Sequence, residues 1–167
     1  MRVADEYGAI VNTEHWRVRQ ATVADADEVG RLLDDFNREF DTPTPGPGVL
    51  AERLRVLLAT DQTIAILAGE PAIGVALITL RPNVWYSGPV ALLDELYVVA
   101  PLRSRGIGTT LIRQLLEIAQ RRHVGLVEIN VDEGDVDAQR FYERHGFTAV
   151  DPDSDERAFY YFRELGD

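Results

Sequence analysis

The sequence predicts an α/β protein with a mixed, mostly antiparallel central sheet and helices on both faces. Amphipathic helical patterns alternate with short apolar runs along the chain. An antiparallel hairpin region then leads into a strand–helix–strand unit, whose crossover is right-handed in nearly all proteins. With 167 residues, 46% hydrophobic and 27% charged, the composition is that of one soluble domain. Residues 15–167 are expected to form this domain, with residues 1–14 as a flexible extension.

The first part of the chain is predicted to contain one strand and two helices. His15–Gln20 alternates as a strand does, and Asp25–Phe40 carries apolar residues at helical spacing. Residues 41–48 hold three prolines and two glycines and must form a loop. Leucines share one helix face from Leu50 to Leu58.

The pattern then changes from helical to strand-like. Apolar runs at 63–68 and 72–80, separated by a short Gly69–Pro71 turn, predict a hairpin. After a connection, Ala91–Val99 is predicted to be a strand that is buried on both faces.

The last third is predicted to alternate between helices and strands. A long helix follows Gly108 and ends near His123, and Leu126–Val131 is expected to be another buried strand. A short helix over Asp137–His145 stops at Gly146, a common C-terminal residue. The aromatic tail, 156–165, is expected to form a last strand.

Composition excludes several kinds of chemistry. The chain has no cysteine, which excludes disulfides, thiolate metal sites and cysteine nucleophiles. It also has no lysine, which excludes a P-loop lysine and Schiff-base catalysis. His15, His123 and His145 form no spacing typical of metal ligands, so no metal is expected.

Charge and hydropathy limit the partners and the location. A net charge of -11 argues against nucleic-acid binding and would attract a cationic substrate. No apolar run is long enough for a signal peptide or a membrane span, so a cytoplasmic protein without membrane contact is expected. The sequence leaves a homodimer open.

The most informative segment is a strand, a glycine turn and a helix within Leu92–Ile112. Arg103, Arg105, Gly106 and Gly108 lie in the turn. Glycines let the backbone approach a ligand closely, and the amides of a helix N-terminus attract phosphate. Arginine side chains can add charge-assisted contacts. The pattern predicts a phosphate site, although a plain glycine-rich turn would look the same.

A dinucleotide fingerprint is the competing interpretation of this turn. It requires a third glycine at position 111, which is Leu111. The acidic residue that it also requires, about 20 residues on, would be Glu128, which lies in the middle of a predicted strand. Too little chain follows for the usual doubly wound sheet, which makes a Rossmann-type protein the less favoured alternative.

A second signature lies in Asn130–Phe147. Asp135, Ala138, Phe141, Tyr142, Gly146 and Phe147 match the pattern NxxAxxFYxxxGF, except that Asp135 replaces the asparagine. Together with the RxxGxG turn, this pattern resembles the GNAT superfamily of N-acetyltransferases. The resemblance covers the chain from about residue 15 to the end.

The resemblance implies a site for acetyl-CoA on a splayed βαβ unit. In this family the strand before the glycine turn separates from its neighbour and offers backbone amides to the pantetheine arm. That role falls here on Tyr97, Val98 and Val99. The residues that would surround the pyrophosphate are Arg103, Ser104, Arg105, Gly106, Ile107, Gly108 and Thr109. Asp135 and Ala138 occupy further cofactor positions, although Asp135 could instead cap the following helix.

Acetyl transfer to an amine also needs groups that move protons. The resemblance gives Tyr142 the role of general acid toward the departing thiolate. Asp94 and Glu95 are the candidates for the base that deprotonates the amine. Because adjacent strand residues point to opposite faces, only one of them is expected to face the acceptor. Without a cysteine, direct transfer in a ternary complex is favoured.

The acceptor is expected to be a primary amine of a small molecule or a peptide. Phe36 and Phe40, before the proline loop, and Trp85 and Tyr86, before the central strand, are expected to flank its pocket. The main alternative is a catalytically silent acyl-CoA sensor with the same fold.

Overall fold

The computed structural model describes residues 3–4, 10–11, 16–151 and 153–165. By backbone contacts the chain forms two compact units, Met1–Ile129 and Asn130–Asp167. Of the predicted flexible extension, the structure describes the short strands β1 (Val3–Ala4) and β2 (Ile10–Val11), which pair antiparallel. The other residues of that extension, and His15 of the first predicted strand, lie outside the described residues.

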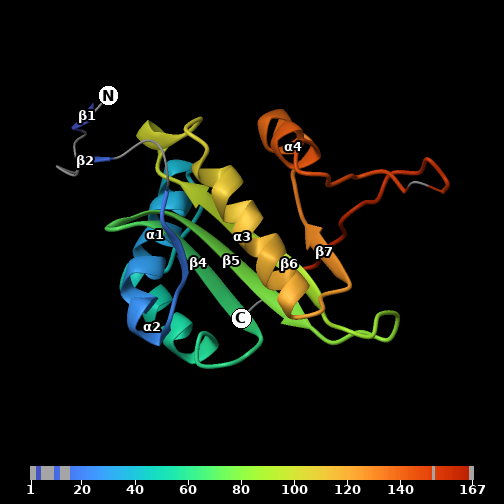
Figure 1. Cartoon of the computed structure of the whole chain (residues 1–167), viewed down its shortest axis with the longest axis horizontal. Helices are drawn as coiled ribbons and strands as arrows, with labels where there is room; N and C mark the ends of the chain where they lie inside the picture. The colour runs from blue at the N-terminus through green and yellow to red at the C-terminus, as the bar shows by residue number, and fades with distance from the viewer. Residues whose placement is uncertain (1–2, 5–9, 12–15, 152, 166–167) are drawn as a thin grey trace. The chain divides into compact units, whose positions relative to one another are not determined.

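The first unit is built on a five-stranded sheet in the order β3-β4-β5-β6-β7 (Figure 1). Its strands are β3 (Val18–Gln20), β4 (Thr63–Gly69), β5 (Ala72–Arg81), β6 (Val90–Val98) and β7 (Leu126–Ile129). The first three pairings are antiparallel, and β6 pairs with β7 in parallel. The predicted mixed, mostly antiparallel sheet is therefore confirmed.

Burial explains why the middle strands form the centre of the unit. Residues Thr63–Ala68 of β4 are all buried, and β5 is buried over Ala72–Ala76. Such continuous apolar runs are stable only when both faces of a sheet are covered. By contrast, no residue of β7 is buried, and Leu126 is 40% exposed, because β7 is an edge strand. The prediction that Leu126–Val131 is a buried strand is wrong in both its burial and its length.

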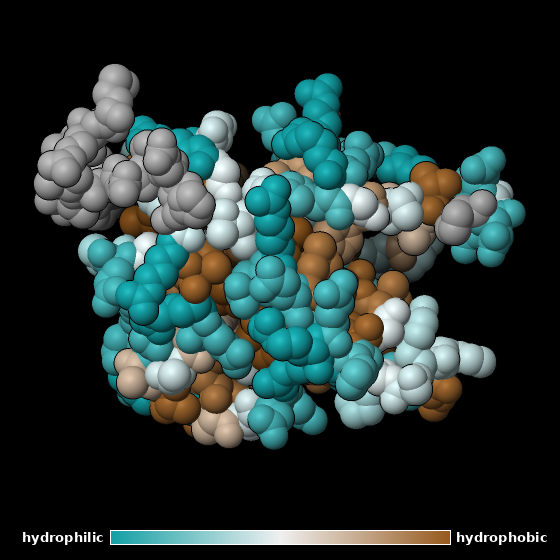
Figure 2. All heavy atoms as spheres, in the orientation of Figure 1, coloured by the Kyte–Doolittle hydropathy of each residue, from teal (hydrophilic) through white to brown (hydrophobic). Residues whose placement is uncertain are grey.

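Helix α1 (Ala26–Glu39) packs on one face of the sheet and α2 (Pro47–Leu57) packs against α1, while α3 (Ile107–Arg121) packs on the other face. The α1 face is marked by Tyr97, which stacks on Phe36 of α1. The α3 face is marked by Gly74, whose added Cβ would meet Ile107 and Leu111. Figure 1 shows α3 crossing the front of the sheet. Its outward residues, which include Arg113, Glu117 and Arg121, give the hydrophilic strip that Figure 2 shows there.

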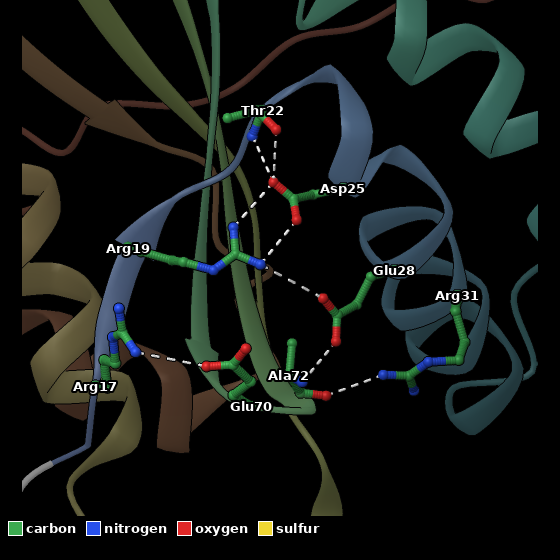
Figure 3. Close-up of polar contacts among 8 residues, drawn as sticks. All are labelled: Arg17, Arg19, Thr22, Asp25, Glu28, Arg31, Glu70 and Ala72. Carbon is green, nitrogen blue, oxygen red and sulfur yellow. Dashed lines mark hydrogen bonds and ion pairs between the residues drawn. The ribbon is translucent and has the colours of Figure 1, made fainter.

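A polar network holds the start of α1 against the sheet (Figure 3). Arg19 of β3 makes two hydrogen bonds to Asp25, which also accepts from the N–H and hydroxyl of Thr22. Arg19 lies 3.7 Å from Glu28, and Glu28 accepts from the backbone N–H of Ala72. The Arg19 guanidinium is the main reason why the pKa of Asp25 is strongly lowered. One chain of contacts thus joins β3, α1 and the β4–β5 hairpin.

The second unit contains α4 (Val136–Glu143) and the tail. Gly146 follows the helix with a φ of 85°, in the left-handed conformation that glycine adopts at helix ends. The predicted strand over 156–165 is wrong. The structure gives this segment a single bridge, Val150 to Arg157, and its aromatic residues are 66–88% exposed. No neighbouring strand among the described residues pairs with the tail beyond that bridge, so its backbone cannot form a ladder.

None of the helices in the described part of the chain is both long enough and apolar enough to cross a membrane.

The close packing of α1 on α2 depends on Gly30. A Cβ at this position would lie 2.9 Å from the carbonyl oxygen of Pro47 and 3.0 Å from the backbone nitrogen of Ala51. Gly30→Ala is therefore expected to lower the free energy of unfolding by about 1–2 kcal/mol, despite the better helix propensity of alanine. Urea denaturation measures this change. Gly48→Ala in α2 is the control, because nothing lies within 4 Å of its added Cβ. Equal stability of the two variants would contradict the packing argument.

Candidate active site

The central feature of the site is the place where β6 separates from β7. The parallel pairing runs from Val90 with Leu126 to Leu93 with Ile129 and ends there. From Asp94 to Val98, the only strand that pairs with β6 among the described residues is its antiparallel neighbour β5. One edge of this segment is therefore open for hydrogen bonds with a ligand. The predicted splay of the strand before the glycine turn is present.

The hydrogen-bond ladder shows which residues face the open edge. The N–H of Val99 donates to the carbonyl of Ile73 in the β5 direction, 3.0 Å away. In an antiparallel pair the backbone groups of successive residues point alternately to the two sides. Tyr97 and Val99 thus face β5, whereas Val98 and Leu96 face the open edge. Leu96 is a backbone position that the sequence analysis missed, and the alternation along the strand could have indicated it.

A β-bulge places both candidate bases on one face of the sheet. Leu77 pairs with Glu95, but the next residue, Ile78, pairs with Leu93, so Asp94 is the extra residue. Glu95 shares the α1 face with Tyr97, two residues farther along. Asp94 accepts a hydrogen bond from the hydroxyl of Thr79 on that same face, at 2.7 Å. The expectation that the two acids point to opposite faces of the sheet is wrong, because a bulge re-aims a side chain.

Electrostatically, these two carboxylates are uncompensated. Partial burial raises the pKa of Asp94, and the hydrogen bond from Thr79 opposes that shift. Burial also raises the pKa of Glu95, with a further contribution from the charge of Asp94. Neither carboxylate forms an ion pair with any residue that the structure describes. They form a negative surface that can attract an ammonium group and receive a proton.

The glycine turn connects β6 to the N-terminus of α3. Ser104 and Gly106 adopt positive φ values of 60° and 84°. Gly106 precedes the first residue of α3, where the leading N–H groups have no partner within the helix. The indole N–H of Trp16 donates to the carbonyl oxygen of Arg105 at 3.0 Å. The turn can hold an anion through its backbone amides and the helix dipole.

The two arginines of this turn differ in what they contact. The Arg105 side chain is exposed and makes no hydrogen bond or ion pair with a described residue. Arg103 instead forms an ion pair with Glu39 at 2.6 Å, and its Nε donates to the carbonyl of Val98 at 2.9 Å. Only Arg105 is therefore free to reach a phosphate without breaking a contact within the protein.

The four aromatic residues predicted for the acceptor pocket are not brought together. Phe36 and Phe40 contact each other, with ring centroids 5.3 Å apart, and Phe36 stacks on Tyr97 near the C-terminal end of β6. Trp85 and Tyr86 precede the other end of β6, which lies ~26 Å away at ~3.3 Å per residue. Trp85 is 87% exposed. Only the Phe36 pair lies near the turn.

The remaining predicted residues belong to the second unit. Asp135 caps α4 by accepting a hydrogen bond from the N–H of Ala138 at 2.9 Å, so these two predicted cofactor residues bond to each other. The Tyr142 ring lies 5.2 Å from that of Phe141 and 5.9 Å from that of Phe147. The carbonyl of Tyr142 accepts a hydrogen bond from the N–H of Phe147, which joins the last two residues of the motif, Gly146 and Phe147, to α4.

An open strand edge that leads into a glycine turn and a helix N-terminus is an arrangement that can hold an extended, phosphate-bearing ligand. Residues 27–147 match the acetyltransferase (GNAT) family, a family of acetyl-CoA-dependent N-acetyltransferases, and the chain belongs to it. The sheet, with one parallel pairing among four, is not doubly wound, so the Rossmann-type alternative is wrong.

Known proteins resemble the chain to different extents. A crystal structure from Arthrobacter sp. FB24, assigned as an acetyltransferase, is 49% identical with a TM-score of 0.86, and the match covers 91% of this chain and 97% of that one. The aminoalkylphosphonate N-acetyltransferase of Salmonella typhimurium is 27% identical over 78% of this chain and 83% of that protein. An uncharacterized N-acetyltransferase of Methanocaldococcus jannaschii is 41% identical over 58 residues, which span 35% of this chain and 26% of that protein.

The raised pKa of Glu95 predicts a cost in stability at neutral pH. A carboxyl whose pKa is raised by folding stabilises the fold while it is protonated, and this contribution is lost as pH rises through the folded-state pKa. Glu95→Gln removes the charge, so the variant is expected to unfold at higher urea concentration than the wild type at pH 7. The difference should shrink below about pH 4, where wild-type Glu95 is protonated in both states.

The control for this experiment is Glu52→Gln, at an exposed position of α2. It is expected to leave the urea midpoint unchanged at both pH values. A Glu95→Gln variant that is less stable than the wild type at pH 7 would show that the Glu95 carboxylate contributes to folding and is not merely tolerated.

Proposed function

We propose that the protein transfers the acetyl group of acetyl-CoA to a primary amine of a small molecule or a peptide, by direct transfer in a ternary complex. The observation that carries this proposal is the open edge of β6 at Leu96 and Val98, which continues into the turn at Gly106. Two carboxylates that form no ion pair with a described residue, Asp94 and Glu95, lie on the same strand. The backbone edge proposed for the cofactor and the carboxylates proposed as proton acceptors would thus lie on neighbouring residues of one strand.

The residues present fit acetyl-CoA. The backbone of Leu96 and the N–H of Val98, whose carbonyl already accepts from Arg103, would bind the pantetheine amides as a strand binds its neighbour. The turn from Arg103 to Thr109 would surround the pyrophosphate, with the amides at the start of α3 and the Arg105 side chain as donors. An added Cβ at Gly106 would have nothing within 4 Å, so the backbone there lies open to a ligand.

Proton movements then fall to this chain's acids and to Tyr142. Acetyl-CoA supplies a reactive thioester, and attack by a neutral amine forms the C–N bond as the C–S bond breaks. An amine with an ordinary pKa of about 10.4 is almost entirely protonated at neutral pH, so a base must accept its proton. Glu95 or Asp94 takes this proton, directly or through water. The Tyr142 hydroxyl donates a proton to the departing thiolate, and the second proton that the amine nitrogen loses as the amide forms restores the phenol through water.

The best test is a panel of amines with detection of released CoA by a thiol reagent. The protein carries no cysteine, so it contributes no background signal. The panel includes a monoamine, a diamine, a peptide with a free N-terminus and an aminoalkylphosphonate, the last because of the Salmonella relative. Turnover of any member supports the proposal. Saturable binding of acetyl-CoA without turnover of any amine would instead identify the silent acyl-CoA sensor.

Arg105 is expected to strengthen cofactor binding. Arg105→Gln removes a charged donor from the turn and should weaken acetyl-CoA binding by at least about tenfold, since a hydrogen bond to a charged group contributes ~1.5–3 kcal/mol and ~1.4 kcal/mol is a factor of ten. Isothermal titration calorimetry measures the Kd. Arg113→Gln, at an exposed position on the outward side of α3, is the control and should leave the Kd unchanged. Equal affinities of the two variants would remove Arg105 from the site.

Tyr142 is expected to act in turnover and not in binding. Tyr142→Phe keeps the ring and its contacts with Phe141 and Phe147 but removes the proton donor. A positioned acid contributes about 10²- to 10⁴-fold, so kcat should fall by that factor while the Kd for acetyl-CoA is retained. Tyr160→Phe, at a 66% exposed position of the tail, should change neither quantity. An unchanged kcat in Tyr142→Phe, with chemistry rate-limiting, would make Tyr142 a packing residue.

A further inference from the structure

Arg103 links two parts of the first unit that are far apart in sequence. Its guanidinium meets the Glu39 carboxylate twice, with Nη1 2.6 Å from Oε1 and Nη2 2.8 Å from Oε2. This fork of two parallel contacts is the strongest geometry that an arginine and a carboxylate can form. Glu39 is the last residue of α1, and Arg103 begins the glycine turn. The pair therefore joins the C-terminal end of α1 to the turn.

Further contacts fix this arginine in place. Its Nε donates to the carbonyl of Val98, so Nε and both terminal nitrogens have acceptors within the protein. The guanidinium carbon also lies 5.6 Å from the ring centre of Tyr97 and 5.9 Å from that of Phe40, within the range of cation–π attraction. To reach a phosphate, the Arg103 side chain would have to abandon these partners.

Glu39 is held as firmly from its own side. Its Oε2 also accepts a hydrogen bond from the Tyr97 hydroxyl at 3.1 Å. Tyr97 is buried, and burial together with this bond raises its pKa to about 12, so the phenol remains a donor at any physiological pH. Tyr97 lies on the same face of β6 as Glu95, and its ring stacks on Phe36 of α1. The end of α1 is thus anchored beside the two carboxylates.

We propose that Glu39 is a positioning residue that ties the end of α1 to the glycine turn through Arg103, so that acetyl-CoA bound at the turn orders the acceptor side of the site. The inference rests on the proposed function, because it takes the turn as the pyrophosphate site. A ligand that fixes the turn also restricts Arg103, and the fork passes that restriction to Glu39 and Phe40. Acceptor binding then becomes thermodynamically coupled to acetyl-CoA binding.

The experiment is hydrogen–deuterium exchange of the full-length protein with and without acetyl-CoA, followed in two segments. One segment covers the turn and the start of α3, and the other covers the last turn of α1, residues 37–40. In the wild type, acetyl-CoA should slow exchange in both segments. In Glu39→Ala it should still slow exchange at the turn, while the slowing at the end of α1 should be lost. Alanine keeps the helix, so this variant is expected to fold.

Two further variants distinguish the effect of the Glu39–Arg103 ion pair from a general effect on α1. Arg103→Gln should behave like Glu39→Ala, with the Kd for acetyl-CoA changed much less than in Arg105→Gln. Asp35→Ala, one helical turn before Glu39, breaks only the ion pair with Arg31 and should exchange like the wild type. For an amine that the panel identifies, Glu39→Ala should raise KM for the amine at saturating acetyl-CoA and leave the Kd for acetyl-CoA, measured without amine, unchanged.

The outcomes distinguish the two proposals. If acetyl-CoA does not slow exchange at the turn of the wild type, the proposed function fails and takes this inference with it. Suppose instead that acetyl-CoA slows exchange at the turn, but slows it at the end of α1 equally in the wild type and in Glu39→Ala, or in neither. Then only the positioning role of Glu39 is refuted.

Discussion

The separation of β6 from β7 after Leu93 is the constraint on which the proposed site depends. One extra residue, Asp94, enters β6 opposite the Leu77–Ile78 step of β5, just as the pairing with β7 ends. The bulge turns Asp94 and Glu95 toward one face, and the loss of the neighbour opens the backbone of Leu96 and Val98. A regular strand would point the two acids to opposite faces. The bulge therefore places both acids on one face, beside the edge that the end of β7 leaves open.

The other half of the proposed cofactor site depends on how closely α3 approaches the sheet. Gly74 of β5 allows this approach, since a Cβ there would lie 3.2 Å from the carbonyl oxygen of Tyr97 and 3.3 Å from the side chains of Ile107 and Leu111. Ile107 and Leu111 lie in the first turns of α3 and are fully buried. Packing against β5 thus sets the distance between the N-terminus of α3 and the sheet. The same packing fixes the position of the backbone amides in the glycine turn.

Much of this arrangement could be predicted from local sequence patterns. Helical apolar spacing located α1 and α3, and continuous apolar runs located strands β4 to β6. The bulge could not be predicted, since it depends on the register between β5 and β6, although two adjacent acids in an apolar strand were a signal. The Arg103–Glu39 pair joins residues 64 apart in sequence, so no local pattern predicts it. The strand predicted for the tail was wrong for the opposite reason. Its residues have a local preference for β structure, but a strand also needs a neighbouring strand to pair with.

The hydrogen bond from Trp16 to the carbonyl of Arg105 gives the protein a natural optical probe. The chain has two tryptophans, and only Trp16 contacts the glycine turn. Indole emission responds to the polarity and the charges around the ring, so a phosphate group arriving beside Arg105 changes the field at this fluorophore. Trp85 is 87% exposed at the far end of β6 and contributes a steady solvent-like signal. Occupancy of the turn can thus be followed in the unlabelled protein.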